Sequence, residues 1–268
     1  MKVAAIQMTS GSDYHQNMIV AKSLISEAGF KKARLIVLPE MFACIGVSNQ
    51  AMLAEQFFTE KKLVETIGGW AKDNDIYIVA GSVPFTSLEK NRVCAACFVF
   101  SPKGEILAQY NKIHLFDVSV GDEKGTYRES DTFVAGDVPV ITDIDGKRLG
   151  LSICYDLRFP ELYQHYQASN CIMMTVPSAF THQTGKQHWE VLLRARAIEN
   201  QCFIIAANQS GTHDDGRKTW GHSMIVSPSG EVLDVVLQEG EGMAIADLNF
   251  DEQALLKSAM PLSDHKRL

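Results

Sequence analysis

The chain has 268 residues and a mass of 29.7 kDa, a size that one large α/β domain fills as readily as two small ones. Hydrophobic residues make up 46% of it and charged residues 21%, which provides for a sizeable core and excludes global disorder. Asp and Glu outnumber Lys and Arg by 32 to 25, for a net charge of −7. This acidic balance argues against a nucleic-acid partner and against an anionic membrane surface.

Cysteine usage and the amino terminus bear on the compartment. Six cysteines are too few for a disulfide scaffold in a chain of this length, which favours a reducing environment. The start MKVAAIQM meets Gln7 after a short apolar run and lacks the cleavage site of a signal peptide. No stretch approaches the roughly 18 apolar residues of a membrane span. We therefore expect a cytoplasmic protein with no membrane partner.

Short apolar runs alternate with segments of helical period along the first part of the chain, a pattern typical of a layered α/β domain. Gly68 and Gly69 fall inside one of these helical segments and are able to break it. The elements predicted in chain order are a strand at 3–8, a helix capped by Asp13 and ended by Gly29, a strand at 34–38, a helix at 53–72 and a strand at 76–82.

Turn residues predict at least three hairpins. Pro102-Lys103-Gly104, Asp145-Gly146 and Pro228-Ser229-Gly230 each separate two strand-like runs. Because hairpins need antiparallel pairing, a mixed sheet with helices outside is favoured over a purely parallel sheet or a (β/α)₈ barrel. No linker or low-complexity tract divides the chain, which predicts one domain over residues 1–268. The later predicted elements are helices at 160–168, 186–201 and 250–258 and strands at 171–176, 202–207 and 224–226.

Cys154 stands where a buried strand gives way to a helix. The run LGLSIC ends at the cysteine, and YDLRFPEL follows with Pro160 suited to a first helical turn. A side chain on such a turn projects from the sheet edge, and the amides after it are able to bind an oxyanion, as in a nucleophile elbow. The alternative is a buried structural cysteine, the commoner fate of this residue type.

A cysteine nucleophile needs a base or a cation beside it, because a free thiol with a pKa of about 8.5 is only a few per cent thiolate at pH 7. Glu40 ends LIVLPE, where Pro39 stops the strand, and Lys112 ends EILAQYNK in the same manner. The alternative for each is a solvated loop residue. Three chemistry-bearing residues at strand ends indicate a site more specifically than any one of them.

The segments LPEMF around Glu40, YNKIHLFD around Lys112 and CYDLRFPEL around Cys154 resemble, in order and spacing, the nitrilase superfamily of carbon–nitrogen hydrolases. The resemblance covers residues 3–267 and is strongest with the deaminated glutathione amidases, followed by the ω-amidases. It implies an α/β fold, a four-layered α-β-β-α sandwich of mixed sheets that dimerises through helices beside the active site. It also implies a Glu–Lys–Cys triad with a second glutamate, matched by Glu129 in YRESDTF.

The resemblance gives each of these residues a role. Glu40 is the general base, and Cys154 attacks the amide carbon to form a thioester. Lys112 and the backbone amide of Tyr155 stabilise the oxyanion, while Glu129 keeps Lys112 charged and in place. This chemistry needs no metal and no organic cofactor.

The expected substrate is a small linear amide that carries a carboxylate. Arg158, Lys186 and Arg217 are candidates to hold that acid, although Arg158 has a structural alternative. Residues 122–124 and 213–218 are expected to form exposed loops that border the pocket. The same triad also serves ω-amides, nitriles and N-carbamoyl amino acids, and a noncatalytic binding protein on this fold is a further alternative. A homodimer or higher homo-oligomer is expected.

Two other features have structural interpretations. Cys94 and Cys97 have the spacing of a metal-binding or redox pair, but they lie in the strand-like run RVCAACFVF, whose period of two sends the thiols to opposite faces. The eight histidines show no paired-ligand spacing, so His114 and His188 are interpreted as packing residues or as residues behind the site.

Overall fold

The protein, seen in a computed structural model, is described for residues 1–268 except 48, 60–61, 90, 121–124 and 268. Within this part, one sheet has seven strands in the order β17-β1-β2-β3-β5-β4, with β6 pairing to β5. Parallel pairs β1–β2 and β2–β3 lie beside antiparallel neighbours, so the sheet is mixed. Its strands are β1 (Lys2–Gln7), β2 (Leu35–Val37), β3 (Tyr77–Val79), β4 (Val83–Thr86), β5 (Val93–Phe100), β6 (Ile106–Asn111) and β17 (Gly242–Asp247).

A second sheet of six strands, counted over the same described residues, has the order β16-β15-β12-β11-β10-β9. It too is mixed, because β10, β11 and β12 are parallel while the outer strands are antiparallel to their neighbours. Its strands are β9 (Ile141–Ile144), β10 (Lys147–Leu151), β11 (Met173–Thr175), β12 (Phe203–Ala206), β15 (Met224–Val226) and β16 (Val232–Val235). Two short hairpins stand apart, β7 (Asp117–Ser119) with β8 (Thr126–Arg128) and β13 (Ser210–Thr212) with β14 (Lys218–Trp220).

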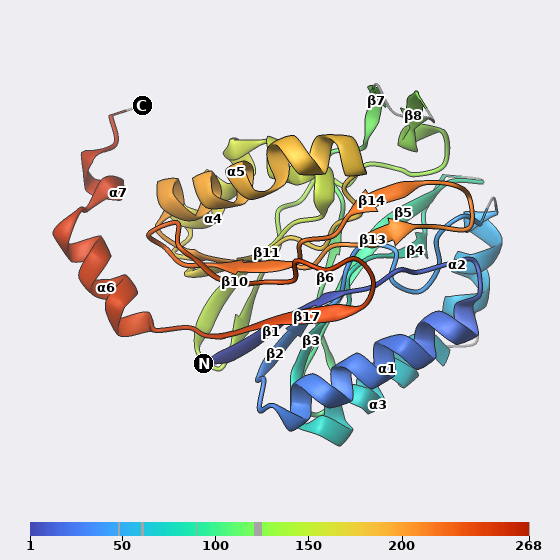
Figure 1. Cartoon of the computed structure of the whole chain (residues 1–268), viewed down its shortest axis with the longest axis horizontal. Helices are drawn as coiled ribbons and strands as arrows, with labels where there is room; N and C mark the ends of the chain where they lie inside the picture. The colour runs from blue at the N-terminus through green and yellow to red at the C-terminus, as the bar shows by residue number, and fades with distance from the viewer. Residues whose placement is uncertain (48, 60–61, 90, 121–124, 268) are drawn as a thin grey trace.

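The helices form the outer layers (Figure 1). α1 and α3 cover the outer face of the seven-stranded sheet, and α4 and α5 cover the other sheet, which gives the order α-β-β-α. The predicted layered sandwich with mixed sheets is confirmed. The helices are α1 (Tyr14–Phe30), α2 (Gln50–Thr59), α3 (Lys62–Asn74), α4 (Pro160–Ala168), α5 (His182–Asn200), α6 (Phe250–Ala259) and α7 (Leu262–His265).

Alternation along β1 shows why the layers form. Val3 and Ala5 join the core cluster that also holds Leu149 and Leu151 of the facing sheet. The residues between and after them, Ala4 and Ile6, join the cluster formed with α1 and α3. Because successive side chains of a strand point to opposite faces, a strand apolar at every position must be covered on both sides.

The three predicted hairpins are present as β5–β6, β9–β10 and β15–β16. The cap at Asp13 is also confirmed, since its carboxylate accepts a hydrogen bond from Gln16 N at 3.1 Å. The strand expected at 3–8 has the expected length but begins one residue earlier, whereas those expected at 34–38, 171–176 and 202–207 are found shorter. None of the helices in the described chain combines the length and apolar content that a membrane crossing requires.

Three helix boundaries differ from the prediction. The helix expected at 53–72 is described as α2 and α3, on either side of residues 60–61, which lie outside the described part of the chain, and the glycine pair lies inside α3. Gly68 is there for close packing, because a Cβ on it would lie 2.6 Å from the carbonyl oxygen of Gly104. Gly29 does not end α1, which continues to Phe30. α5 begins at His182, earlier than the predicted residue 186.

An ion pair joins the two sheets at the amino-terminal ends of β2 and β3. Asp145, in the β9–β10 turn, accepts hydrogen bonds from Arg34 Nε at 2.7 Å and Nη2 at 3.0 Å, and from the Tyr77 hydroxyl at 2.9 Å. Arg34 directly precedes β2, and Tyr77 begins β3. The hydrogen bond from Arg34, followed by the other local contacts, holds the pKa of Asp145 below its ordinary value.

We predict that Asp145→Asn lowers the free energy of unfolding by about 0.5–1 kcal/mol at neutral pH, a modest value because the carboxylate is 36% exposed and screened by solvent. Asn fits this position because residue 145 has a φ of +49°, in the left-handed region that Asn and Asp adopt more readily than most residues. Since the folded pKa is depressed, the stabilisation exists above the ordinary pKa of about 3.9 and is lost as the pH falls through the folded value.

Urea denaturation of both proteins from neutral to acidic pH measures this difference. The two stabilities should converge in acid. A gap that stays constant down to low pH would show that Asp145 acts through its shape and not through its charge.

Candidate active site

Four of the residues singled out in the sequence line one pocket with a volume of about 360 Å³. Glu40 follows β2, Lys112 follows β6 directly, and Cys154 follows β10. Glu129 begins a short 3₁₀ turn, η1 (Glu129–Asp131), after the β7–β8 hairpin. Residues far apart in the chain are thus brought to one place by the ends of strands from both sheets.

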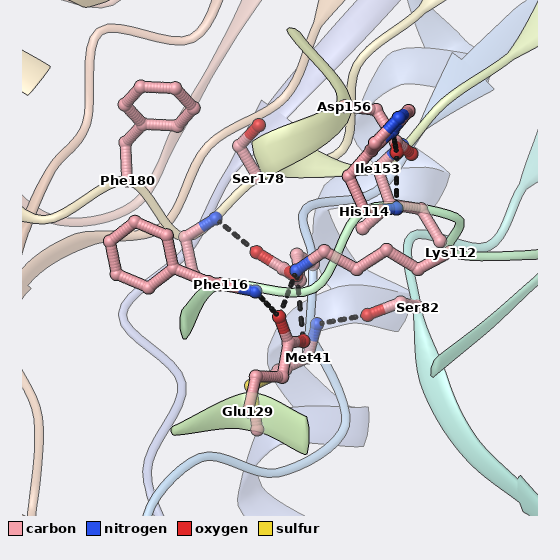
Figure 2. A network of polar contacts seen from close by, with 12 residues as sticks. Met41, Ser82, Lys112, His114, Phe116, Glu129, Ile153, Asp156, Ser178 and Phe180 are labelled. Carbon is pink, nitrogen blue, oxygen red and sulfur yellow. Dashed lines mark hydrogen bonds and ion pairs between the residues drawn. The ribbon is translucent and has the colours of Figure 1, made fainter. Parts of the chain in front are cut away.

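The centre of the site is a buried ammonium between two carboxylates (Figure 2). Lys112 Nζ lies 2.8 Å from Glu40 Oε1 and 2.9 Å from both carboxylate oxygens of Glu129. The side chain of Lys112 is 2% exposed, and that of Glu40 is 6% exposed. In such a place each charge depends on the others, because an unpaired buried charge is strongly disfavoured.

Backbone amides hold both carboxylates. Ala179 N donates to Glu40 Oε2 at 2.8 Å, and Phe116 N donates to Glu129 Oε2 at 2.6 Å (Figure 2). Ala179 lies in the segment PSAF, residues 177–180, which follows β11. Each carboxylate therefore has one oxygen in contact with a fixed amide, and the position of neither depends on Lys112 alone.

The charges shift the pKa values within this cluster. Burial lowers the pKa of Lys112, but the carboxylates of Glu129 and Glu40 outweigh it, and the pKa lies well above its ordinary value. Burial raises the pKa of Glu129, and the charge of Glu40 adds to that rise, while Lys112 opposes it. Lys112 therefore stays protonated at neutral pH.

Cys154 sits on a strained turn. Its φ is +51°, in the left-handed region, and its backbone N donates to Pro177 O at 2.8 Å. It begins the 3₁₀ turn η2 (Cys154–Arg158), and α4 follows with Pro160 in its first position. The expected change from strand to helix at the cysteine is therefore present. Strain of this kind is retained where the surrounding structure enforces it, often at functional sites.

The thiol is held in its neutral form. Burial raises the pKa of Cys154 well above its ordinary value, and the charge and hydrogen bond of Glu40 raise it further, against the opposing charge of Lys112. A preformed thiolate is therefore disfavoured. Glu40 is the carboxylate that contacts this thiol.

The turn that carries Glu40 is fixed by residues that the sequence analysis missed. Gln209 Nε2 donates to Glu40 O at 3.0 Å, and Ser82 Oγ accepts from Met41 N at 3.1 Å. Met41 has a φ of +54°, so this turn is strained as well. Gly81 packs beneath it, because a Cβ there would lie 2.0 Å from Pro39 O. The signal available in the sequence for this role was the polar Gln209 at the end of the apolar run IIAANQ.

The pocket is also lined by arginines. Arg158 and Arg217 line it as predicted, and so does the exposed Arg128, which sequence reasoning missed although it directly precedes Glu129. Lys186 does not line it, contrary to expectation, and lies exposed within helix α5 instead of in a loop at the pocket mouth. Tyr155 lines the pocket beside Cys154.

The contacts of these arginines differ. Arg217 Nη2 pairs with Asp215 Oδ2 at 3.3 Å. The guanidinium of Arg158 lies over the ring of Phe180 at 5.3 Å, and its Nη1 is 3.3 Å from His188 Nδ1. His188 thus packs behind the pocket, as interpreted from the sequence.

The two expected loops have different outcomes. The loop 213–218 borders the pocket through Asp215 and Arg217, but it begins with a buried residue. His213 contacts Ser10 O and Thr219 Oγ1, both at 2.7 Å, so this end of the loop is not exposed as expected. Residues 122–124 lie outside the described part of the chain.

Groups of three or more His, Cys, Asp or Glu side chains arranged to hold a metal ion are not found among the described residues. The cysteines are free thiols, Cys94 and Cys97 included.

Comparisons with known proteins place this sandwich and site in a class. The family model for carbon–nitrogen hydrolases matches residues 2–257. The chain belongs to this family. The predicted family is thereby confirmed, together with the reaction class that its name states.

Several relatives within the family are named for their activity. Deaminated glutathione amidase of Synechocystis sp. is 41% identical over 98% of this chain and 97% of its own length. Omega-amidase NIT2 of Homo sapiens is 36% identical over 99% of this chain and 95% of its own. The crystal structure of the C. elegans NitFhit protein superposes with a TM-score of 0.92 at 36% identity, and the match covers 99% of this chain and 65% of that longer one.

We predict that Lys112→Met lowers the free energy of unfolding by about 3–5 kcal/mol, because it leaves two buried carboxylates without their cation. Adding Glu129→Gln should recover part of this loss by removing one of those charges. The deficit of Lys112→Met should be smaller near pH 5 than near pH 8, since a carboxylate with a raised folded pKa binds a proton in the folded state and loses that stabilisation as the pH rises.

Urea denaturation of the wild type, the two single variants and the double variant forms the required double-mutant cycle. Additive effects of the two substitutions would contradict the coupling between Lys112 and Glu129 that the distances indicate.

Proposed function

We propose that this protein is an amidase that hydrolyses the C–N bond of a small linear amide carrying a carboxylate, of the deaminated glutathione type, through a thioester on Cys154. The observation that carries the proposal is the shared pocket of Cys154, Glu40, Lys112 and Glu129. The similarity to deaminated glutathione amidase and to omega-amidase supports the substrate class. We further propose that residues 1–268 form one carbon–nitrogen hydrolase domain.

In the first half of the reaction, Cys154 Sγ attacks the amide carbon while Glu40 takes the thiol proton. The C–S bond forms and the carbonyl oxygen becomes an oxyanion. Lys112 and the backbone amide of Tyr155 stabilise it, and such a donor typically contributes about 3 kcal/mol. The oxyanion then collapses and the C–N bond breaks. The amine leaves with the proton from Glu40, and a thioester remains.

In the second half, Glu40 takes a proton from water, and the resulting hydroxide attacks the thioester carbon. The C–O bond forms, the C–S bond breaks, and the proton returns to Cys154. Glu129 acts through Lys112. Its carboxylate, 2.9 Å from Nζ, keeps the ammonium charged and aimed at the pocket.

The arginines of the pocket support an acidic substrate. Lys112 and Glu40 are almost completely buried, whereas Arg158 and Arg217 are partly exposed and Arg128 is exposed. The cations that line the pocket therefore lie nearer to solvent than the catalytic cluster. A linear substrate with an amide at one end and an acid at the other fits this distribution.

Other substrates use the same chemistry. An ω-amide is the first alternative, supported by the omega-amidase relative, and nitriles or N-carbamoyl amino acids are further ones. A noncatalytic binding protein would not require the buried charges of Glu40, Lys112 and Glu129. We also propose a cytoplasmic location, in keeping with the free thiols, and a homodimer or higher homo-oligomer.

We predict that Cys154→Ala folds normally and loses all hydrolysis of deaminated glutathione. The substitution removes one sulfur from a turn and leaves little cavity, but no acyl-enzyme is able to form. Ammonia or amine release measures activity, and circular dichroism checks the fold. Wild-type enzyme quenched early with substrate should carry an acyl adduct on Cys154 by mass spectrometry.

The other cysteines provide the control for this result. An adduct found only on Cys94, Cys97, Cys171 or Cys202 would move the site elsewhere, and turnover by pure Cys154→Ala would refute the mechanism.

We predict that an amide lacking the carboxylate is hydrolysed at least about tenfold less efficiently than its acid-bearing analogue, since a lost charge-assisted contact costs about 1.5–3 kcal/mol. Values of kcat/KM for the pair measure this, with α-ketoglutaramate and deaminated glutathione assayed side by side to distinguish the two leading substrates. Equal kcat/KM for the neutral and acidic amides would favour a generalist aliphatic amidase or nitrilase.

A further inference from the structure

Asp156, two residues after the proposed nucleophile, has a completely buried carboxylate whose hydrogen bonds, within the described part of the chain, come from His114, Ile153 and Tyr110 and not from a lysine or an arginine. Its Oδ1 accepts from His114 N at 3.0 Å and contacts His114 Nδ1 at 2.7 Å. Its Oδ2 accepts from Ile153 N at 2.8 Å and from the Tyr110 hydroxyl at 2.7 Å. A buried carboxylate with several donors is satisfied without a cation.

These contacts connect the two segments that carry the reacting groups (Figure 2). Ile153 directly precedes Cys154 on the turn after β10, and His114 lies two residues after Lys112 on the segment after β6. One carboxylate oxygen faces the lysine segment, and the other faces the cysteine turn. Asp156 is absent from the pocket lining, so it acts behind the site.

The contacts require a carboxylate and not an amide. Each oxygen accepts from one backbone N–H, of His114 or of Ile153, and a backbone N–H cannot become an acceptor. An Asn side chain offers only one oxygen. Whichever way its amide is turned, its NH₂ faces one of those two N–H groups, and the segment on that side loses its hydrogen bond.

We propose that Asp156 is a positioning residue that sets the distance between Cys154 and Lys112 by holding both of their backbone segments at once. The inference rests on the proposed function, since it assigns those two residues to the reaction. It predicts that damage to this link slows the chemical step more than it weakens substrate binding, because Arg128 and Arg217, two of the three arginines that line the pocket, lie on other segments.

The test compares Asp156→Asn with wild type. We expect kcat to fall by about a hundredfold, the cost of a misplacement of about 1 Å, with KM changed less than about threefold. The pH dependence of Cys154 alkylation by iodoacetamide should also move to higher pH, because the charge of Lys112 lowers the pKa of this thiol and a displaced Lys112 lowers it less. Asp145→Asn is the matched control, and it should change stability without changing kcat or the alkylation profile.

A second variant removes the side-chain donors and keeps the backbone ones. Tyr110→Phe with His114→Phe keeps an aromatic ring at both positions, so that residue 114 is still able to stack on Phe159, as His114 does at 3.7 Å. Asp156 keeps the backbone N–H groups of residues 114 and 153. We expect its kcat to stay within about fivefold of wild type. This variant tests the inference even if Asp156→Asn does not fold.

The outcomes separate the two proposals. If Cys154→Ala is inactive and folded Asp156→Asn has a near wild-type kcat, the positioning role is wrong and the proposed function stands. A folded double variant with a kcat about a hundredfold below wild type would also overturn the role assigned to the backbone contacts. Turnover by Cys154→Ala would refute the proposed function, and the inference with it.

Discussion

The ammonium of Lys112 between the carboxylates of Glu40 and Glu129 is the interaction on which the rest of the site depends. Removing three charges from water carries a large desolvation cost, and only close pairing and additional hydrogen bonds compensate for it. Distances of 2.8–2.9 Å and the amides of Ala179 and Phe116 supply both. This requirement fixes how the ends of β2 and β6, the η1 turn and the PSAF segment meet.

Backbone strain at two turns is held by the same arrangement. Met41 and Cys154 both have left-handed φ values. Met41 directly follows Glu40, and Cys154 is itself the proposed nucleophile. Ser82 and Gln209 hold the first turn through hydrogen bonds, and Pro177 O holds the second. Strained residues persist only where several contacts fix them, so the buried polar residues behind the pocket have a structural reason to be there.

Much of the fold was predictable because it follows from local patterns. The hairpins came from turn residues such as Asp145-Gly146, and the layered order came from alternating apolar runs together with the family resemblance. Contacts between distant segments were not predictable. Gly68 was interpreted as able to break a helix, because no pattern in the neighbouring sequence indicates its packing against Gly104. Lys186 was placed at the pocket because the predicted helix began too late in the chain.

The residues of the site likewise fall into those that the sequence predicts and those that it does not. Glu40, Lys112 and Cys154 were found because each ends a strand and lies in a recognisable motif, but their backbone partners Gln209 and Ala179 carry no catalytic group and gave no comparable signal.

The charge of the cluster also accounts for the direction in which a substrate would enter. With both carboxylates ionised, two negative charges and one positive charge leave the buried end of the pocket with a net charge of −1. A substrate carboxylate is repelled from that end and attracted to Arg128, Arg158 and Arg217, which lie nearer to solvent. The uncharged amide is then the end that reaches Cys154. Burial raises the pKa of the Cys154 thiol and the charge of Glu40 raises it further, so the charge that orients the substrate also helps to keep the nucleophile protonated.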